Sequence, residues 1–172
     1  QRRAVWEIIQ DCEKQVPMNR LVQGDVGSGK TVVAGLAALS AARAGYQTAL
    51  MAPTEILASQ HAETLSRLLE HFGLHVGLAT GSVKGKARQT LYQQIAEGNV
   101  AVVVGTHALV QNAVQFHCLG FVVVDEQHRF GVEQRQKLLA KSAKMPHLLA
   151  MTATPIPRSL ALTVYGELDV SI

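Results

Sequence analysis

The 172 residues predict an α/β fold in which helices cover both faces of a mainly parallel sheet. Short runs rich in β-branched residues alternate along the chain with longer helical stretches, which is typical of right-handed β–α–β crossovers. Two of the runs, Val100 to Val104 and Phe121 to Val124, are apolar throughout, as expected for strands buried on both faces. The sequence contains no internal repeat and no linker-like stretch, so we expect a single domain over residues 1–172.

Six strands and five helices are expected in order. The strands are Arg20 to Gln23, Thr48 to Ala52, Val76 to Ala79, Val100 to Val104, Phe121 to Val124 and Leu148 to Met151. The helices are Gln1 to Cys12, Lys30 to Ala44, Thr54 to Phe72, Lys84 to Glu97 and Glu133 to Ala140. Gly45 and Gly73 follow two of these helices, at the point where the chain commonly takes a positive φ.

Composition and charge narrow the class of protein. Apolar residues make up 48% of the chain and charged residues 17%, which excludes an intrinsically disordered protein. The net charge of +3 and the pI of about 9.0 favour a polyanionic partner only weakly. The two cysteines, Cys12 and Cys118, are far apart in sequence, which argues against a disulfide framework or a zinc site and suits reduced thiols in the cytoplasm.

Targeting and membrane signals are not found in the sequence. The longest apolar candidate, Val32 to Ala44, is interrupted by glycine and polar residues and does not reach the roughly 18 residues of a membrane helix. The chain opens with neither a signal peptide nor an initiator methionine. We therefore expect no membrane partner, and we expect the chain to be a piece of a larger protein.

Residues 24–31 match the phosphate-binding pattern GxxxxGK[ST] in full. The match follows an expected strand and opens an expected helix, which is the structural context that the pattern needs. Its glycines let successive backbone N–H groups converge on phosphates, and the following helix directs its free amides toward the same anion. We expect Lys30 to bind the phosphates of ATP and Thr31 to bind Mg²⁺. The loop consists of Gly24, Asp25, Val26, Gly27, Ser28, Gly29, Lys30 and Thr31.

A second polar segment follows the strand at 121–124. Two carboxylates, Asp125 and Glu126, end the strand and are followed by Gln127 and His128. In open parallel sheets, ligands bind beyond the carboxyl ends of the strands, so we expect this pair near the phosphate loop. Asp125 would hold Mg²⁺, directly or through water, and Glu126 would align the attacking water. The alternative is an exposed turn after a strand, and for His128 a surface histidine.

Three other strand ends carry polar residues. Backbone amides and hydroxyl groups at the first two, residues 53–54 and 105–107, suit phosphate binding without base recognition. Thr54 suits the N-cap of the following helix equally well.

The third strand end is residues 152–154. Thr152, Ala153 and Thr154 follow the last expected strand, so their hydroxyl groups can reach the acidic loop. The local alternative is a hydroxyl-mediated turn before Pro155 and Pro157.

Taken in order, these segments resemble the motifs of superfamily 2 helicases. Residues 24–31, 125–128 and 152–154 resemble motif I, a DEAH-like motif II and motif III, whereas residues 52–58 and 105–109 resemble motifs Ia and Ib. The first three, with the second and third extended to residues 131 and 158, resemble the RecG family of ATP-dependent DNA helicases. The resemblance covers essentially the whole chain.

The resemblance implies a three-layer RecA-like P-loop domain that binds ATP and Mg²⁺. A second RecA-like lobe and a wedge domain would lie elsewhere in a longer chain, and branched double-stranded DNA, such as stalled forks and Holliday junctions, would be the substrate in recombination and repair. The implied location is the bacterial cytoplasm, at the nucleoid. Because the second lobe would supply an arginine finger, we expect the isolated chain to hydrolyse ATP barely at all.

The resemblance also implies a role for each site residue. Gln1 would contact adenine, residues 53–54 and 105–107 would contact DNA, and residues 152–154 would couple hydrolysis to DNA movement. The implied catalytic residues are Lys30, Asp125, Glu126, Gln127 and His128.

Three alternatives remain open at this point. The first is an Mfd-like transcription-repair coupling translocase, whose motif II usually reads DEEH where this chain has Gln127. The second is a P-loop phosphotransferase acting on a small molecule, although the paired carboxylates favour water as the acceptor. The third is a nucleotide-sensing module without catalytic activity.

Overall fold

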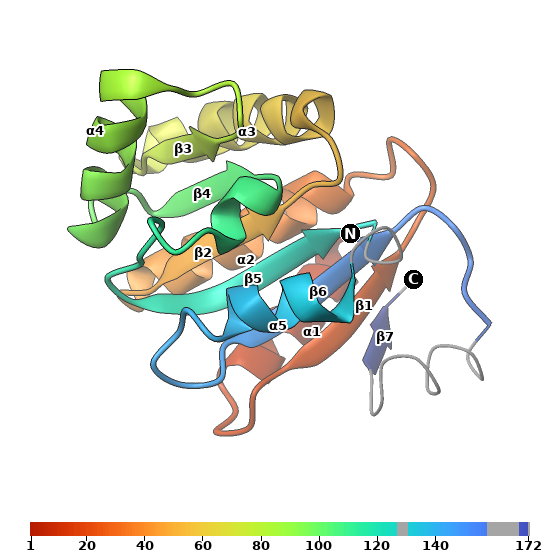
Figure 1. Cartoon of the computed structure of the whole chain (residues 1–172). Coiled ribbons are helices and arrows are strands. Elements are labelled where there is room, and N and C mark those ends of the chain that lie inside the picture. Colours follow the sequence, from red (N-terminus) through yellow and green to blue (C-terminus); the bar gives the residue numbers. More distant parts are fainter. Residues whose placement is uncertain (127–130, 158–168, 172) are drawn as a thin grey trace.

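Parallel strands form one seven-stranded sheet in the computed structural model, which describes residues 1–126, 131–157 and 169–171 (Figure 1). The strand order is β3-β4-β2-β5-β6-β1-β7, and every pairing is parallel. The expected α/β class is therefore confirmed. The strands are β1 (Asn19–Gln23), β2 (Gln47–Met51), β3 (Val76–Ala79), β4 (Val102–Gly105), β5 (Leu119–Asp125), β6 (His147–Thr152) and β7 (Asp169–Ser171).

Helices lie on both faces of the sheet (Figure 1). One face packs against α1, α2 and α3, and the other against α4, α5 and the short helix η2. Within the ranges that the structure describes, no helix has both the length and the hydrophobicity needed to cross a lipid bilayer. The helices are α1 (Arg2–Cys12), α2 (Lys30–Arg43), α3 (Glu55–Leu69), η1 (Glu70–Phe72), α4 (Gly85–Ala96), η2 (His107–Val110) and α5 (Val132–Leu139).

The side chains of β5 alternate strictly between the two helical layers. Phe121 and Val123 belong to the core on the side of α1, α2 and α3, whereas Val122 and Val124 belong to the core on the side of α4 and α5. This alternation is the period of two that a strand imposes, and burial of both faces explains why the run is apolar throughout. By the same count, Asp125 is directed to the layer of α2 and α3.

Two described elements were not expected from the sequence. The helix η2 occupies four residues after β4, and β7 adds a three-residue edge strand beside β1. The guanidinium of Arg20 on β1 ties this edge together, because it donates to Ser171 Oγ (2.6 Å) on β7 and to Asp11 Oδ2 (2.9 Å from Nε) on α1. The expected helix from Thr54 to Phe72 is divided into α3, which ends at Leu69, and the 3-10 helix η1. Elsewhere the expected elements are confirmed, with ends that shift by one or two residues.

Candidate active site

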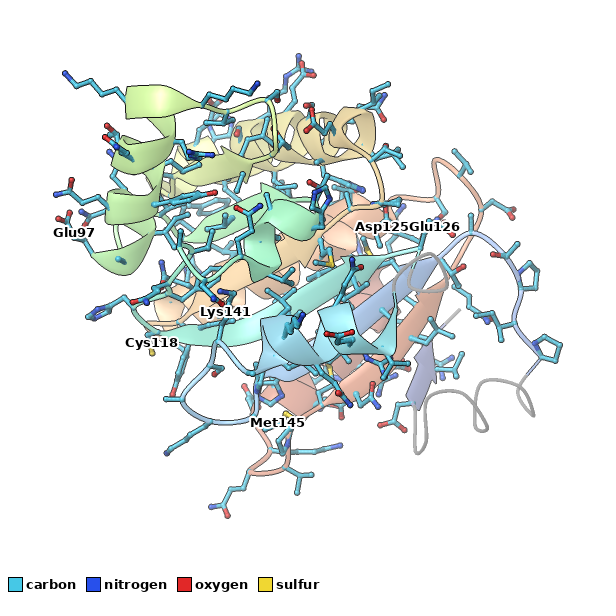
Figure 2. All side chains as sticks on the ribbon, viewed as in Figure 1. Glu97, Cys118, Asp125, Glu126, Lys141 and Met145 are labelled. Carbon is cyan, nitrogen blue, oxygen red and sulfur yellow. The ribbon has the colours of Figure 1, made fainter. Side chains whose placement is uncertain are left out.

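Loops that follow five strands meet at the carboxyl edge of the sheet. They follow β1, β2, β4, β5 and β6, and together with the ends of these strands they contain the described parts of the segments singled out in the sequence. Figure 2 shows Asp125 and Glu126 at this end of β5, with Cys118 at the opposite end. The parallel arrangement alone brings these segments together, although they are spread over 130 residues of sequence.

The loop between β1 and α2 has the conformation expected of a phosphate cradle. Gly27 and Gly29 have φ values of 81° and 86°, in the left-handed region that glycine tolerates. Gly29 is the N-cap of α2 and has no side chain to bind the first amides of that helix, which are left for an anion. The Lys30 ammonium lies along the same loop, where it donates to the carbonyl oxygens of Gly24 (2.5 Å) and Asp25 (2.8 Å).

Gln1 lies against this loop. Its side-chain Nε2 donates to the carbonyl oxygen of Ser28 at 2.6 Å, and its carboxamide occupies the space that a Cβ at Gly29 would enter. The first residue of the chain is therefore beside the phosphate loop, as the predicted adenine contact requires. The contact to adenine itself stays a prediction.

Asp125 and Thr31 lie on either side of a histidine that the sequence analysis did not identify. His61 Nε2 is 2.7 Å from Asp125 Oδ2, and His61 Nδ1 is 3.0 Å from Thr31 Oγ1. The Asp125 side chain is 9% exposed and that of His61 is 13% exposed, so both are largely removed from water. The two residues predicted to bind Mg²⁺ are thus joined through one imidazole ring.

Glu126 leaves the direction of β5 immediately after Asp125. Its φ of 49° is in the left-handed region, which is uncommon for a residue with a side chain. The backbone N–H of Glu126 donates to Met151 O (2.8 Å), and its carboxylate Oε1 accepts from the backbone N–H of Ala153 (3.0 Å). Consecutive carboxylates therefore have different partners, Asp125 the His61 imidazole and Glu126 the loop after β6.

Residues 152–154 contact both the acidic pair and the phosphate loop. Besides the Ala153 bond to Glu126, the carbonyl oxygen of Thr152 accepts from the Gly24 backbone N–H at 3.2 Å. The Thr154 N–H donates to Thr152 Oγ1 at 3.2 Å, which confirms the hydroxyl-mediated turn. This turn leaves the backbone of the segment free to join the two loops beside it.

The residues predicted to contact DNA also have local structural roles. Thr54 is the N-cap of α3, because its Oγ1 accepts from the Leu57 N–H at 3.2 Å. A side chain at Gly105 would collide with the carbonyl oxygen of Ala79 on β3, so close strand packing explains this glycine.

The other three differ in their exposure. His107 is exposed and Pro53 is half-buried. Thr106 is buried, and its hydroxyl oxygen has no hydrogen-bond partner in the described part of the chain. Of this set, the exposed groups that could reach a phosphate backbone in this structure are at Thr54 and His107.

The residues of this edge fit ATP and Mg²⁺. Mg²⁺ is typically held by one or two protein oxygens together with substrate phosphates and water, and Thr31 and Asp125 supply such oxygens. Over residues 1–126, 131–157 and 169–171, no group of three or more His, Cys, Asp or Glu side chains is arranged to hold a metal ion. Gln127 and His128, which were predicted to be catalytic, lie outside the described residues.

Comparison with known proteins shows which family the chain belongs to. The model of the DEAD/DEAH box helicase family matches residues 1–163. The chain belongs to this family. Among curated relatives, the chain is 55% identical to the ATP-dependent DNA helicase RecG of Aquifex aeolicus, 59% identical to that of Haemophilus influenzae and 56% identical to that of Bacillus subtilis. Each match covers the whole chain but only 22–25% of the relative.

Two solved structures have the same fold as this chain. A structure of RecG bound to a three-way DNA junction matches 98% of this chain and 22% of that chain, with a TM-score of 0.83 and 48% identity. A DEAD box protein from Methanococcus jannaschii matches 98% of this chain and 47% of that chain, with a TM-score of 0.71 and 21% identity. The architecture is therefore that of a RecA-like helicase lobe, as the sequence resemblance implied.

Proposed function

We propose that residues 1–172 form a single RecA-like lobe that binds ATP within a longer DNA translocase. The observation that supports this most strongly is the direct connection of three segments at one sheet edge. The phosphate loop is bonded to Thr152, the acidic residue Glu126 is bonded to Ala153, and Asp125 is joined to Thr31 through His61. A phosphate cradle, a carboxylate for the metal ion and a carboxylate for water are the parts that phosphoryl transfer to water requires.

Each residue has a distinct part in this proposal. Lys30 would exchange its contacts to the loop carbonyl oxygens for contacts to the β- and γ-phosphates. Thr31 and Asp125 would hold a magnesium ion, whose charge neutralises that of the phosphates. Glu126 would align water for attack on the γ-phosphorus. Gln1 would contact adenine, whereas Gln127 and His128 keep the catalytic roles that the family resemblance implies.

We further propose that the longer protein acts on branched double-stranded DNA. The relatives are named ATP-dependent DNA helicase RecG, and a three-way DNA junction is bound in the structure of RecG that matches this chain at 48% identity. Within residues 53–54 and 105–107, the exposed groups of Thr54 and His107 would contact the DNA backbone, and the other three residues would shape the two loops. A second RecA-like lobe and a wedge domain would be the partners within the same chain, and the bacterial nucleoid in the cytoplasm would be the place of action.

Substitution Lys30→Ala tests the nucleotide site. Loss of the ammonium removes charge-assisted hydrogen bonds to phosphate, so the dissociation constant for a fluorescent ATP analogue with Mg²⁺ should rise about 10–100-fold. Lys144→Ala is the matched control, because Lys144 is an exposed lysine just before β6, at the other end of the sheet. Fluorescence titration measures the dissociation constants of both variants. Equal affinity of Lys30→Ala and wild type would contradict the proposal.

A filter-binding assay tests the DNA substrate. The full-length protein that contains this chain should retain forked DNA at low salt and release it as salt increases, because backbone contacts depend on counterion release. Absence of affinity for forked DNA at low salt would favour the small-molecule phosphotransferase.

A further inference from the structure

His61 is a buried polar side chain that connects three elements. It lies on α3, and its imidazole ring reaches Thr31 in the first turn of α2 and Asp125 at the end of β5. The ring is 13% exposed, and the distances at its two nitrogens are 3.0 Å and 2.7 Å, both within the range of hydrogen bonds. Both hydrogen-bonding positions of the ring are therefore used.

The chemistry of these contacts determines which atoms remain available. An ionised carboxylate only accepts, so the ring donates from Nε2 to Asp125 Oδ2. In the neutral tautomer Nδ1 then accepts, and the Thr31 hydroxyl donates its hydrogen to it. This arrangement takes up the hydroxyl hydrogen of Thr31 and one oxygen of Asp125. The lone pairs of Thr31 Oγ1 and the Oδ1 oxygen of Asp125 stay available to a cation.

Helix packing fixes the position of the ring. Gly35 lies one turn after Thr31 on α2, and a Cβ added there would be 2.6 Å from a methyl carbon of Leu68 and 2.8 Å from one of Leu65. The missing side chain at Gly35 thus lets α2 and α3 approach closely. Leu65 lies one turn after His61 on α3, so the close approach occurs beside the His61–Thr31 contact.

We propose that His61 is a positioning residue for Thr31 and Asp125, the residues that would bind magnesium. This inference rests on the proposed ATP site and deepens it. His61 touches neither nucleotide nor metal ion in this role; it holds one atom of each ligand residue and so fixes the direction of the other lone pairs. Partners of metal ligands commonly act in this way, and their loss typically costs about 10–100-fold in metal affinity.

Substitution His61→Leu in the 172-residue chain tests the proposal. Affinity for a fluorescent ADP analogue is measured at one pH in EDTA and then over a range of magnesium concentrations. The magnesium concentration for half-maximal enhancement of binding should rise about 10–100-fold, whereas the affinity in EDTA should stay within about twofold of wild type. His71→Leu is the matched control, because His71 is an exposed histidine on η1, and it should leave both values unchanged.

His61→Gln provides a second variant of the same site. A carboxamide carries one acceptor and one donor, so it can accept from Thr31 and donate to Asp125. Its magnesium requirement should lie within about threefold of wild type. Recovery by glutamine, with thermal melting temperatures close to wild type, would distinguish positioning from a general structural role.

Other results would overturn the inference. An unchanged magnesium requirement in His61→Leu would show that the ring positions nothing, and a lowered requirement would show that the ring competes with the metal ion. Equal loss of affinity in EDTA and in magnesium would indicate a structural role alone. Wild-type chain that binds no nucleotide would remove the proposed ATP site, and this inference with it, whereas magnesium-dependent binding that is indifferent to His61 would remove only the inference.

Discussion

Glu126 has the most unusual backbone of the residues at the sheet edge. It is the one non-glycine residue with a positive φ among those that the structure describes, and such a conformation typically costs about 1–2 kcal/mol for a residue with a Cβ. Hydrogen bonds to Met151 and Ala153 hold it there. The conformation turns the Glu126 carboxylate away from the direction of β5 and toward the loop after β6, so that Asp125 and Glu126 have separate environments.

Substitution Glu126→Gln in the full-length protein should therefore separate hydrolysis from binding. A glutamine still accepts the Ala153 hydrogen bond but is not basic, so kcat for ATP should fall about 10²–10⁴-fold. The KM should change little, because the phosphate loop and Asp125 are intact. Steady-state ATPase assays with saturating forked DNA measure both constants. A kcat close to that of wild type would exclude Glu126 as the residue that aligns water.

Among the individual site residues, those that form contiguous patterns could be predicted from the sequence. The phosphate loop and the acidic pair were predicted because their residues are adjacent in sequence and follow strands. His61 was missed because its partners Thr31 and Asp125 are 30 and 64 residues away. One signal was present: His61 lies three residues after buried Ala58 and four before buried Leu65, on the apolar stripe of its helix.

Elements at the β7 edge of the sheet are connected by a buried ion pair. Asp11 of α1 and Arg20 of β1 are both buried, and Arg20 also binds Ser171 of β7. Burial raises the pKa of the Asp11 carboxyl, but hydrogen bonds from Lys14 and Arg20 outweigh this effect, so its pKa lies below the usual value. The short strand β7 was not predicted because its three residues include the polar Asp169 and Ser171, and it is held by its backbone pairing with β1 and by the Arg20 network.

Substitution Asp11→Asn should lower the free energy of unfolding by about 3 kcal/mol at neutral pH, because Arg20 is left buried without its closest charge partner. A lowered folded-state pKa contributes stability above the unfolded-state pKa, and this contribution is lost as the pH falls through the folded-state value. The difference between variant and wild type should therefore shrink below about pH 4. Urea denaturation at several pH values measures it.

Glu133→Gln is the control for this prediction. Glu133 forms an exposed ion pair with Lys137 at 2.8 Å on α5, with side chains that are 79% and 58% exposed. Exposed pairs contribute little, so the free energy of unfolding of this variant should be close to that of wild type. A difference for Asp11→Asn that is no larger, or that persists unchanged in acid, would contradict the role of the buried pair.

In the whole molecule, the two halves of the proposed ATP site lie at the ends of strands that are not neighbours. The phosphate loop follows β1, and the acidic pair lies at the end of β5. β6 lies between β5 and β1, so with a spacing of about 4.8 Å between neighbouring strands, β5 and β1 are about 10 Å apart. The sequence predicted the fold class and the shared edge, since these follow from the parallel β–α–β pattern. It did not predict strand order, which depends on pairings between distant segments.

Turnover by the isolated chain should be far below that of the full-length protein. An arginine finger contributes about 10³–10⁵-fold to phosphoryl transfer, and we expect the second lobe to supply it. The 172-residue chain should therefore bind ATP with little hydrolysis. Phosphate release by the chain and by the full-length protein with forked DNA, measured at equal concentrations, compares the two. Similar turnover numbers would show that one lobe contains the complete catalytic apparatus.

The alternation of β5 between its two helical layers has a final consequence. Removing one valine from this strand would keep an apolar run followed by the same acidic residues. The carboxylate of Asp125 would nevertheless be turned to the opposite side, toward α5, and its distance from the imidazole would grow by the thickness of the sheet. The number of residues that precede Asp125 in β5, odd or even, is therefore as important for the proposed nucleotide site as the aspartate itself.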